Sequence, residues 1–154
     1  TVPTDLPAGW RAGPRLVGKD FRRRSVVLLG GRYEDFILTA RVRFLRGERA
    51  GVVLRADAAG RTGWYALADR RMGRVEFGLL DRERFIDARQ WTPADEVELK
   101  IVALAESVEV YADGRLLIHQ VRHRERTGAV GLAVERAEAE FVPPVLQPFD
   151  PRKA

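Results

Sequence analysis

The chain has 154 residues, with 27 basic and 22 acidic side chains, which gives a formal net charge of +5 at pH 7. Because it has no cysteine, the sequence excludes a disulfide framework, a thiolate metal site and a cysteine nucleophile. It has no apolar run of roughly eighteen residues, the length that a transmembrane helix needs. Its length fits one domain with its own hydrophobic core.

The basic residues are almost all arginine, and most alternate with acids. Lysine occurs only at positions 19, 100 and 153, which leaves 24 arginines among the 27 basic residues. Mixed runs at 69–71, 81–84 and 122–126 are typical of a solvated, ion-paired surface. The run Arg22-Arg23-Arg24 is the densest, but it lacks the aromatic array along one strand face on which nucleic-acid bases stack. The sequence therefore predicts no nucleic-acid partner and no membrane partner.

Period-two alternation predicts strands along most of the chain. Residues 1–19 form a proline-rich lead-in or edge strand. Residues 36–44 place an apolar side chain at every second position, as do 97–103 and 108–112, which is typical of half-buried antiparallel strands. Asp113-Gly114 then favours a two-residue hairpin, because both positions tolerate positive φ, and it predicts a returning strand after the turn.

Shorter apolar runs bring the expected strand number to about eleven or twelve, and no segment favours a helix. These runs lie at 25–29, 50–56, 63–68, 74–80, 84–88, 128–134 and 137–142. Many short strands separated by turn residues predict a sandwich or a barrel. We expect a single β-sandwich domain over residues 1–142 and a C-terminal tail over 143–154, which starts at two consecutive prolines.

Several short motifs between residues 33 and 141 resemble those of a known group of domains. They are Tyr33-Glu-Asp-Phe36, the stretch AGVVLRAD at 50–57, Gly63-Trp-Tyr65, ELKIV at 98–102, SVEVYADG at 107–114 and GAVGL at 128–132. On these motifs the chain resembles the concanavalin A-like modules: family 66 carbohydrate-binding modules, the C-terminal sandwich of family 32 glycoside hydrolases, and DUF1080 domains. The resemblance implies an all-β fold, a two-sheet antiparallel jelly-roll sandwich.

The same resemblance implies a non-catalytic carbohydrate-binding module that recognises a glycan at a concave or loop-end site. Alternation places Arg55 on one face with Val53 and Asp57. A guanidinium held by a carboxylate can donate paired hydrogen bonds to sugar hydroxyls. The alternative is that Arg55 forms a structural ion pair with Asp57 or with an acid on another strand.

Three further residues complete the predicted ligand site. Trp64 and Tyr65 point to opposite faces of their strand, so one can offer a sugar-stacking platform beside Arg55 while the other belongs to the core. Asp35 is one of several acids at strand ends, where a jelly roll displays binding groups. The alternative for Asp35 is ordinary surface charge.

The sequence predicts no catalytic residue and no metal ligand. Retaining glycosidases use two carboxyl groups about 5 Å apart, and on this fold they carry an E-x-D-x-x-E pattern that the chain lacks. The pairs Glu96/Glu98 and Glu138/Glu140 are better explained as solvated faces. His119 and His123 would lie about 13 Å apart along an extended strand, at roughly 3.3 Å per residue, which is too far for one metal ion. No cofactor is predicted, and calcium is left as an open alternative.

Two other functions stay open beside the binding module, which the sequence favours over an enzyme. One is a glycoside hydrolase of the DUF1080 type, and the other is a structural or interaction sandwich that is accessory to a catalytic domain. The expected partners are therefore a carbohydrate and an adjacent domain of a larger protein. The location is unknown, and it would be extracellular if the domain belongs to a secreted glycan-active protein.

Overall fold

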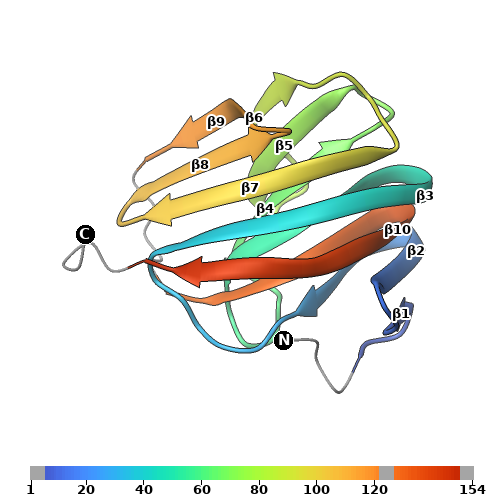
Figure 1. Ribbon diagram of the computed structural model, residues 1–154, viewed down its shortest axis with the longest axis horizontal. Helices are drawn as coiled ribbons and strands as arrows, with labels where there is room; N and C mark the ends of the chain where they lie inside the picture. Colours follow the sequence, from blue (N-terminus) through green and yellow to red (C-terminus); the bar gives the residue numbers. More distant parts are fainter. Residues whose placement is uncertain (1–5, 122–126, 150–154) are drawn as a thin grey trace.

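The computed structural model describes residues 6–121 and 127–149, which form ten β-strands and no helix (Figure 1). The strands are β1 (Trp10–Arg11), β2 (Leu16–Leu28), β3 (Phe36–Ala56), β4 (Trp64–Asp69), β5 (Arg74–Leu79), β6 (Phe85–Gln90), β7 (Glu96–Leu104), β8 (Ser107–Ala112), β9 (Arg115–Gln120) and β10 (Ala129–Pro148). Nothing in this part of the chain is a helix long and apolar enough to cross a membrane. Three segments lie outside the described residues: residues 1–5, the mixed run at 122–126, which includes His123, and the expected tail residues 150–154.

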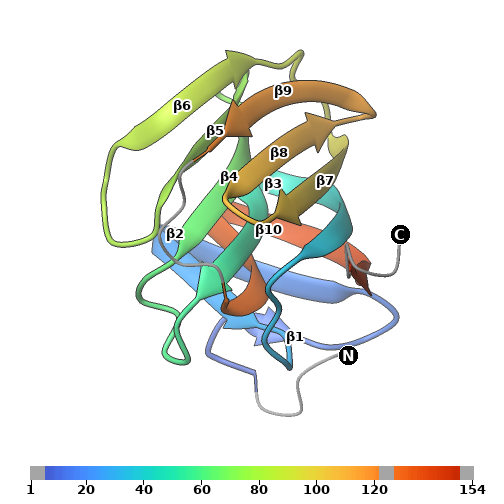
Figure 2. The same cartoon turned by 90° about the vertical axis from the view of Figure 1, so that its left-hand side faces the viewer.

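The strands pair antiparallel throughout and fold into two layers (Figures 1 and 2). One layer, here the β4–β6 sheet, continues through β4, β5 and β6 from the second half of β3. The other, here the β7–β9 sheet, continues through β7, β8 and β9 from the first half of β3. Strand β10 also runs through both layers beside β3, and β2 runs beside β10 on its other side. The architecture is the two-sheet sandwich that the alternation and the resemblance predicted.

The long strands pass from one layer to the other at a bend in which Gly47 and Arg136 have positive φ, 92° and 50°. A Cβ at position 47 would lie 2.2 Å from the Arg136 carbonyl oxygen, so only glycine fits. The register of β10 against β2 also shifts between Glu135 and Ala137. Bulges of this kind turn a strand without ending its pairing. The runs 36–44 and 50–56, expected as separate strands, are therefore one strand, and so are 128–134 and 137–142.

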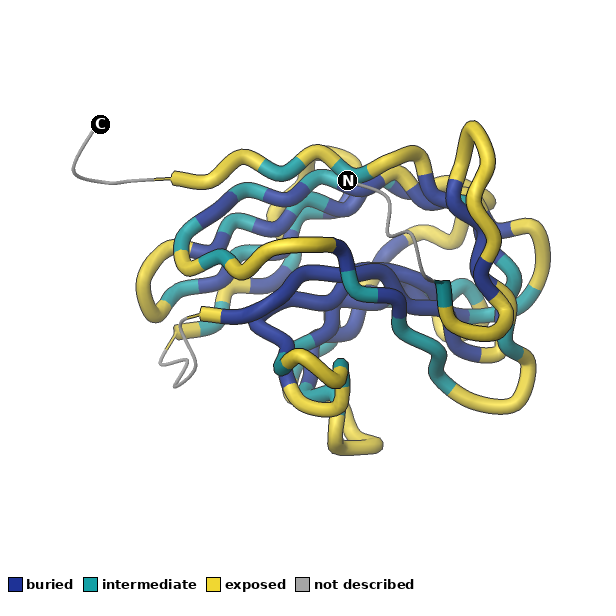
Figure 3. The backbone as a smooth tube through the Cα atoms, turned by 90° about the horizontal axis from the view of Figure 1, so that it is seen from below, coloured by how far each residue is buried: buried dark blue, intermediate teal, exposed yellow. Residues whose placement is uncertain are grey.

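The main hydrophobic core lies between the two layers and takes side chains from every long strand. Figure 3 shows buried backbone along both layers and exposed turns at their ends. A second, smaller apolar cluster lies on the outer face of the β4–β6 sheet. Its buried members are Val53, Ala56, Tyr65, Leu67, Ala129 and Ala133. Part of that outer face is therefore buried from solvent, and the charged residues of the face lie beside this apolar cluster.

Two local expectations have clear outcomes. Asp113 and Gly114 both have positive φ, 51° and 83°, and Ala112 pairs with Arg115, so the predicted two-residue hairpin is confirmed. The expected start of the tail at residue 143 is wrong, because β10 continues to Pro148 beside β3. Its register shifts between Val142 and Val145, so Pro143 and Pro144 lie where the ladder is interrupted, which is where a sheet tolerates proline.

Candidate functional site

A row of alternating charges crosses the outer face of the β4–β6 sheet. Directly paired residues of neighbouring strands lie on the same face of a sheet, and the row consists of Arg24, Glu135, Arg49, Asp69 and Arg74, from β2, β10, β3, β4 and β5. Glu76 lies two positions beyond Arg74 on β5, so it shares this face. Arginines and carboxylates from five strands thus meet in one place.

Arg49 is the centre of this arrangement. Its Nη1 donates to Glu135 and its Nη2 donates to Glu76, while its Nε lies 3.6 Å from an Asp69 carboxylate oxygen. Burial by itself would lower the pKa of Arg49. The negative charges of Glu135, Glu76 and Asp69 outweigh burial and raise that pKa above its ordinary value. Arg49 therefore stays charged although its side chain is only 9% exposed.

The carboxylates of Glu135 and Glu76 also contact other arginines. Glu135 accepts a hydrogen bond from Arg24 Nε at 2.9 Å and lies 3.3 Å from Arg136 Nη2. Glu76 accepts from Arg74 Nε at 2.7 Å. Buried charges are stable only when they are paired and hydrogen-bonded. We call this set the charge network; its members are Arg24, Arg49, Arg74, Arg136, Asp69, Glu76 and Glu135.

Tyr65 lies under the charge network. The Arg24 guanidinium carbon is 4.3 Å from the centroid of its ring, and the residue is fully buried. Desolvation raises the pKa of Tyr65, although Arg24 and Arg49 act in the opposite direction. The hydroxyl therefore keeps its proton at neutral pH. Because Arg24 covers the ring, the ring is not available as a stacking platform for a sugar.

A hollow of about 590 Å³ opens above Arg24, Arg49 and Glu135. Its lining residues are Arg22, Arg23, Arg24, Arg49, Leu80, Asp81, Arg82, Glu83, Glu135 and Arg136. One wall is the bulge of β2, where Asp20 accepts backbone hydrogen bonds from Arg22 and Arg23. The other wall is the turn at 80–83, which Leu80 attaches to the sheet through its hydrogen bond to Gly63 at 2.9 Å. We call this space the arginine-lined hollow.

The floor of the hollow offers donors and acceptors side by side. Arg24 uses Nε for Glu135 and Nη1 for the Leu80 carbonyl oxygen, and its third nitrogen, Nη2, has no partner among the described residues. Guanidinium groups donate in a rigid fork, whereas a carboxylate only accepts. The adjacent hydroxyls of a sugar can donate and accept at once. The floor therefore suits a polyhydroxylated ligand.

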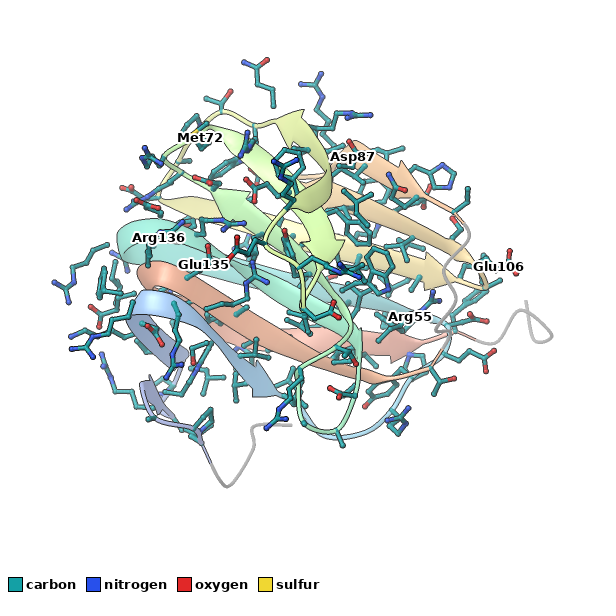
Figure 4. The ribbon with its side chains drawn as sticks, turned by 180° about the vertical axis from the view of Figure 1, so that it is seen from behind. Arg55, Met72, Asp87, Glu106, Glu135 and Arg136 are labelled. Atoms are coloured by element: carbon teal, nitrogen blue, oxygen red, sulfur yellow. The ribbon has the colours of Figure 1, made fainter. Side chains whose placement is uncertain are left out.

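Arg55 lies elsewhere, at the opposite end of the sheet from Glu135 and Arg136 (Figure 4). A bulge with φ of 49° at Arg55 interrupts the alternation, and Ala56, not Arg55, joins Val53 in the outer apolar cluster. Arg55 is only 2% exposed. Its Nη2 donates to the carbonyl oxygens of Ala105 at 2.8 Å and Glu34 at 3.3 Å. The expectation that Arg55 shares a face with Val53 is therefore wrong.

Asp57 and Asp35 each organise a loop. Asp57 accepts hydrogen bonds from the backbone of Arg61 at 2.8 Å and Thr62 at 3.2 Å. The bonds from Thr62 and Arg61 lower the pKa of Asp57. Asp35 accepts from the backbone of Ala105 at 2.7 Å, so Asp35 and Arg55 hold the same turn. A ligand-binding role for these residues stays a prediction.

Trp64 and Tyr65 do point to opposite faces, as predicted. The Trp64 ring stacks on Phe77 of the main core, with centroids 5.2 Å apart and an interplanar angle of 12°. Tyr65 lies on the outer face. Of the five predicted site residues, the structure thus brings only Tyr65 to the charge network, and it brings Arg55 and Asp35 together elsewhere.

Sequence reasoning missed Arg49 and Glu135, and it placed Glu76 only among the acids at strand ends that are commonly surface charge. Glu76 is a single charge between the core residues Val75 and Phe77, and Arg49 and Glu135 each adjoin one core residue, Ala50 and Val134. Such a charge within a buried strand is the available signal, but only the pairing register shows that the three meet. In the described ranges, no group of three or more metal-ligating side chains is placed to hold a metal ion.

No family model matches the chain, and no curated protein matches it. Among solved structures it is similar to the carbohydrate-binding module CBM66 from Bacillus subtilis, with a TM-score of 0.82 and 22% identity, covering 90% of each chain. The chain has the concanavalin A-like jelly-roll fold. This confirms the fold predicted from the sequence motifs.

Other solved structures agree on this jelly roll. A putative glycosyl hydrolase from Parabacteroides distasonis has a TM-score of 0.67 at 12% identity and covers 92% of this chain and 84% of its own. Sheep Galectin-11, in complex with glycerol, has a TM-score of 0.53 at 11% identity and covers 80% of this chain and 96% of its own. At these identities the likeness is one of fold, so the function has to be argued from the site.

Proposed function

We propose that the domain is a non-catalytic carbohydrate-binding module that binds sugar hydroxyls in the arginine-lined hollow. The observation that carries this proposal is the floor of the hollow, where Nη2 of Arg24, held in place by the two other nitrogens, adjoins the carboxylate of Glu135. The likeness in fold to a carbohydrate-binding module and to a galectin supports it. The charge network prepares this floor in advance, so binding costs little ordering of side chains.

The position of Arg49 favours binding over glycoside hydrolysis. Glycosidases place two carboxyl groups about 5–9.5 Å apart, with the scissile bond between them. Here the Arg49 guanidinium lies between Glu76 and Glu135 and bonds to both. The space that a scissile bond would need is therefore filled by a side chain. This geometry supports the binding module over a hydrolase of the DUF1080 type.

The test is a glycan-array screen of the domain, followed by calorimetry on each ligand found. We expect Arg24→Ala to weaken binding at least tenfold, because hydrogen bonds to a charged group contribute about 1.5–3 kcal/mol. The matched control is Arg41→Ala, which also removes one arginine paired with a glutamate, but on the β7–β9 sheet; it should change affinity less than about threefold. Melting temperatures of both variants show that the fold is intact.

An equal effect of the two substitutions would place the sugar outside the hollow and contradict the proposed site. The same titrations with a calcium chelator test the open alternative of calcium, since calcium-dependent binding would be lost. Where no glycan binds at all, the carbohydrate-binding proposal fails.

The accessory sandwich is the second candidate function, and the exposed apolar side chains at the sheet edges favour it. Phe85 and Ile86 of β6 are 39% and 51% exposed, and Leu116 of β9 is 48% exposed. Exposed apolar side chains on edge strands mark surfaces that pack on another domain. The discriminating experiment replaces Ile86 with Lys and measures both the packing on the adjacent domain and the glycan affinity. If the domain is an accessory sandwich, the substitution weakens that packing and leaves glycan affinity unchanged.

A further inference from the structure

The two faces of the sandwich differ in the balance of their charges. The arginine-lined hollow has six arginines and three acids in its lining, which gives a net charge of +3. A hollow of about 300 Å³ on the outer face of the β7–β9 sheet has Arg15, Arg41 and Arg43 against four acids, a net charge of −1. The whole chain has 27 basic and 22 acidic residues, and the arginine-lined hollow has an excess of positive charge that the hollow on the other face lacks.

Three of the arginines in this lining form no ion pair with a carboxylate among the described residues. Arg22, Arg23 and Arg82 are exposed, and among the described residues no carboxylate oxygen lies within 4.0 Å of their guanidinium nitrogens. By contrast, Arg24, Arg49 and Arg136 are each paired with Glu135. The floor arginines are therefore held in the charge network, whereas the wall and rim present three arginines that belong to no ion pair in the described part of the chain, beside two acids, Asp81 and Glu83.

From this arrangement we infer that the ligand of the hollow is an anionic glycan, whose sugars carry carboxylate or sulfate groups. This inference rests on the proposed function and names its ligand class. Sugar hydroxyls would meet Arg24 and Glu135 on the floor, and the oxyanions would meet Arg22, Arg23 and Arg82. Guanidinium groups bind carboxylate and sulfur or phosphorus oxyanions through paired, charge-assisted hydrogen bonds. A neutral sugar would offer these three arginines no anionic partner.

The experiment uses two pairs of glycans, each a charged form and an uncharged form of the same sugar backbone. The carboxylate arm compares oligogalacturonate with its fully methyl-esterified form, and the sulfate arm compares dextran sulfate with dextran. Isothermal titration at about 50 mM and 300 mM salt measures affinity, since screening weakens exposed charge interactions. We expect at least one anionic form to bind about tenfold or more tightly than its neutral partner, and this preference to shrink at the higher salt.

Two triple variants with equal loss of charge locate the effect. R22A/R23A/R82A removes the rim arginines, and we expect it to lower affinity for the anionic glycan about tenfold or more, as three charge-assisted contacts would. The control R11A/R41A/R115A removes three exposed arginines from the other side of the sandwich, and its affinity should stay within about threefold. Equal losses in the two variants would overturn the inference, because net charge alone would explain them.

The remaining outcomes separate the two proposals. Equal binding of charged and neutral glycans would overturn the anionic ligand and leave the carbohydrate-binding module standing. Binding of polyglutamate or double-stranded DNA as tight as that of the anionic glycans would also overturn it, in favour of general polyanion binding. If none of the four glycans and no glycan of the array binds, both proposals are overturned.

Discussion

Strand β3 has two buried arginines, Arg49 and Arg55, and their surroundings differ. Six positions along an extended strand separate them by roughly 20 Å. Arg49 contacts three carboxylates and lines the floor of the arginine-lined hollow. Arg55 donates to the backbone of two loops. Burial alone therefore does not mark an arginine as ligand-binding: what it contacts, and whether a hollow opens above it, decides between a site and a structural brace.

The largest effect is expected from Arg49→Met. The substitution leaves Asp69, Glu76 and Glu135 crowded together without their shared cation, and breaking a buried ion pair from one side costs about 3–5 kcal/mol. Urea unfolding measures the change in the free energy of unfolding. Adding Glu76→Gln and Glu135→Gln should recover most of the loss. A loss below about 1 kcal/mol would show that the other arginines suffice to hold the network.

The next largest effect is expected from Arg55→Met, which tests the second buried arginine of β3. It removes the donor that the carbonyl oxygens of Glu34 and Ala105 share, and an unsatisfied buried acceptor costs about 1–3 kcal/mol. We expect a loss of about 2–3 kcal/mol in the free energy of unfolding, with the glycan affinity of the folded protein unchanged. Lost affinity without lost stability would restore Arg55 to the ligand site and remove the contrast with Arg49.

These two arginines also show which features could be predicted from the sequence and which could not. Alternation over 36–44 and the Asp113-Gly114 turn correctly predicted strands and a hairpin, because both depend on local conformation. The faces of Arg55 and Asp57 could not be predicted by counting, since a single bulge at Arg55 shifts every later residue to the other face.

The charge network could not be predicted from the sequence at all. Arg49, Glu76 and Glu135 are far apart in the sequence, and no local pattern relates them. They meet because β10 pairs with β3 in the register that places Glu135 opposite Arg49, and because β4 and β5 follow beside β3 and bring Glu76 to the same face. A prediction of the site needed that long-range pairing, whereas the fold needed only the pattern of strands.

A smaller effect is expected from Tyr65→Phe at alkaline pH. The raised pKa of Tyr65 means that the unfolded chain, with an ordinary value of 10.0, loses this proton before the folded protein does. The stabilisation is therefore complete below pH 10 and is lost as the pH rises from 10 through the folded value, by at most about 1.4 kcal/mol per pH unit. Urea unfolding between pH 8.5 and 11 should show a steeper decline for the wild type than for the variant. Parallel curves would mean that Tyr65 ionises freely in the fold.

The smallest effect is expected from Arg43→Ala, the exposed counterpart of Arg49 on the β7–β9 sheet. Arg43 also contacts two carboxylates, Glu140 at 3.3 Å and Glu96 at 4.0 Å, but its side chain is 53% exposed. Solvent-exposed ion pairs contribute only about 0–1 kcal/mol, because water screens them and ordering long side chains opposes them. We expect a loss below about 0.5 kcal/mol at 0.15 M salt and a smaller one at 1 M, where the Debye length is about 3 Å. A loss comparable with that of Arg49→Met, insensitive to salt, would mean that the number of carboxylate partners and not their burial sets the strength of these networks.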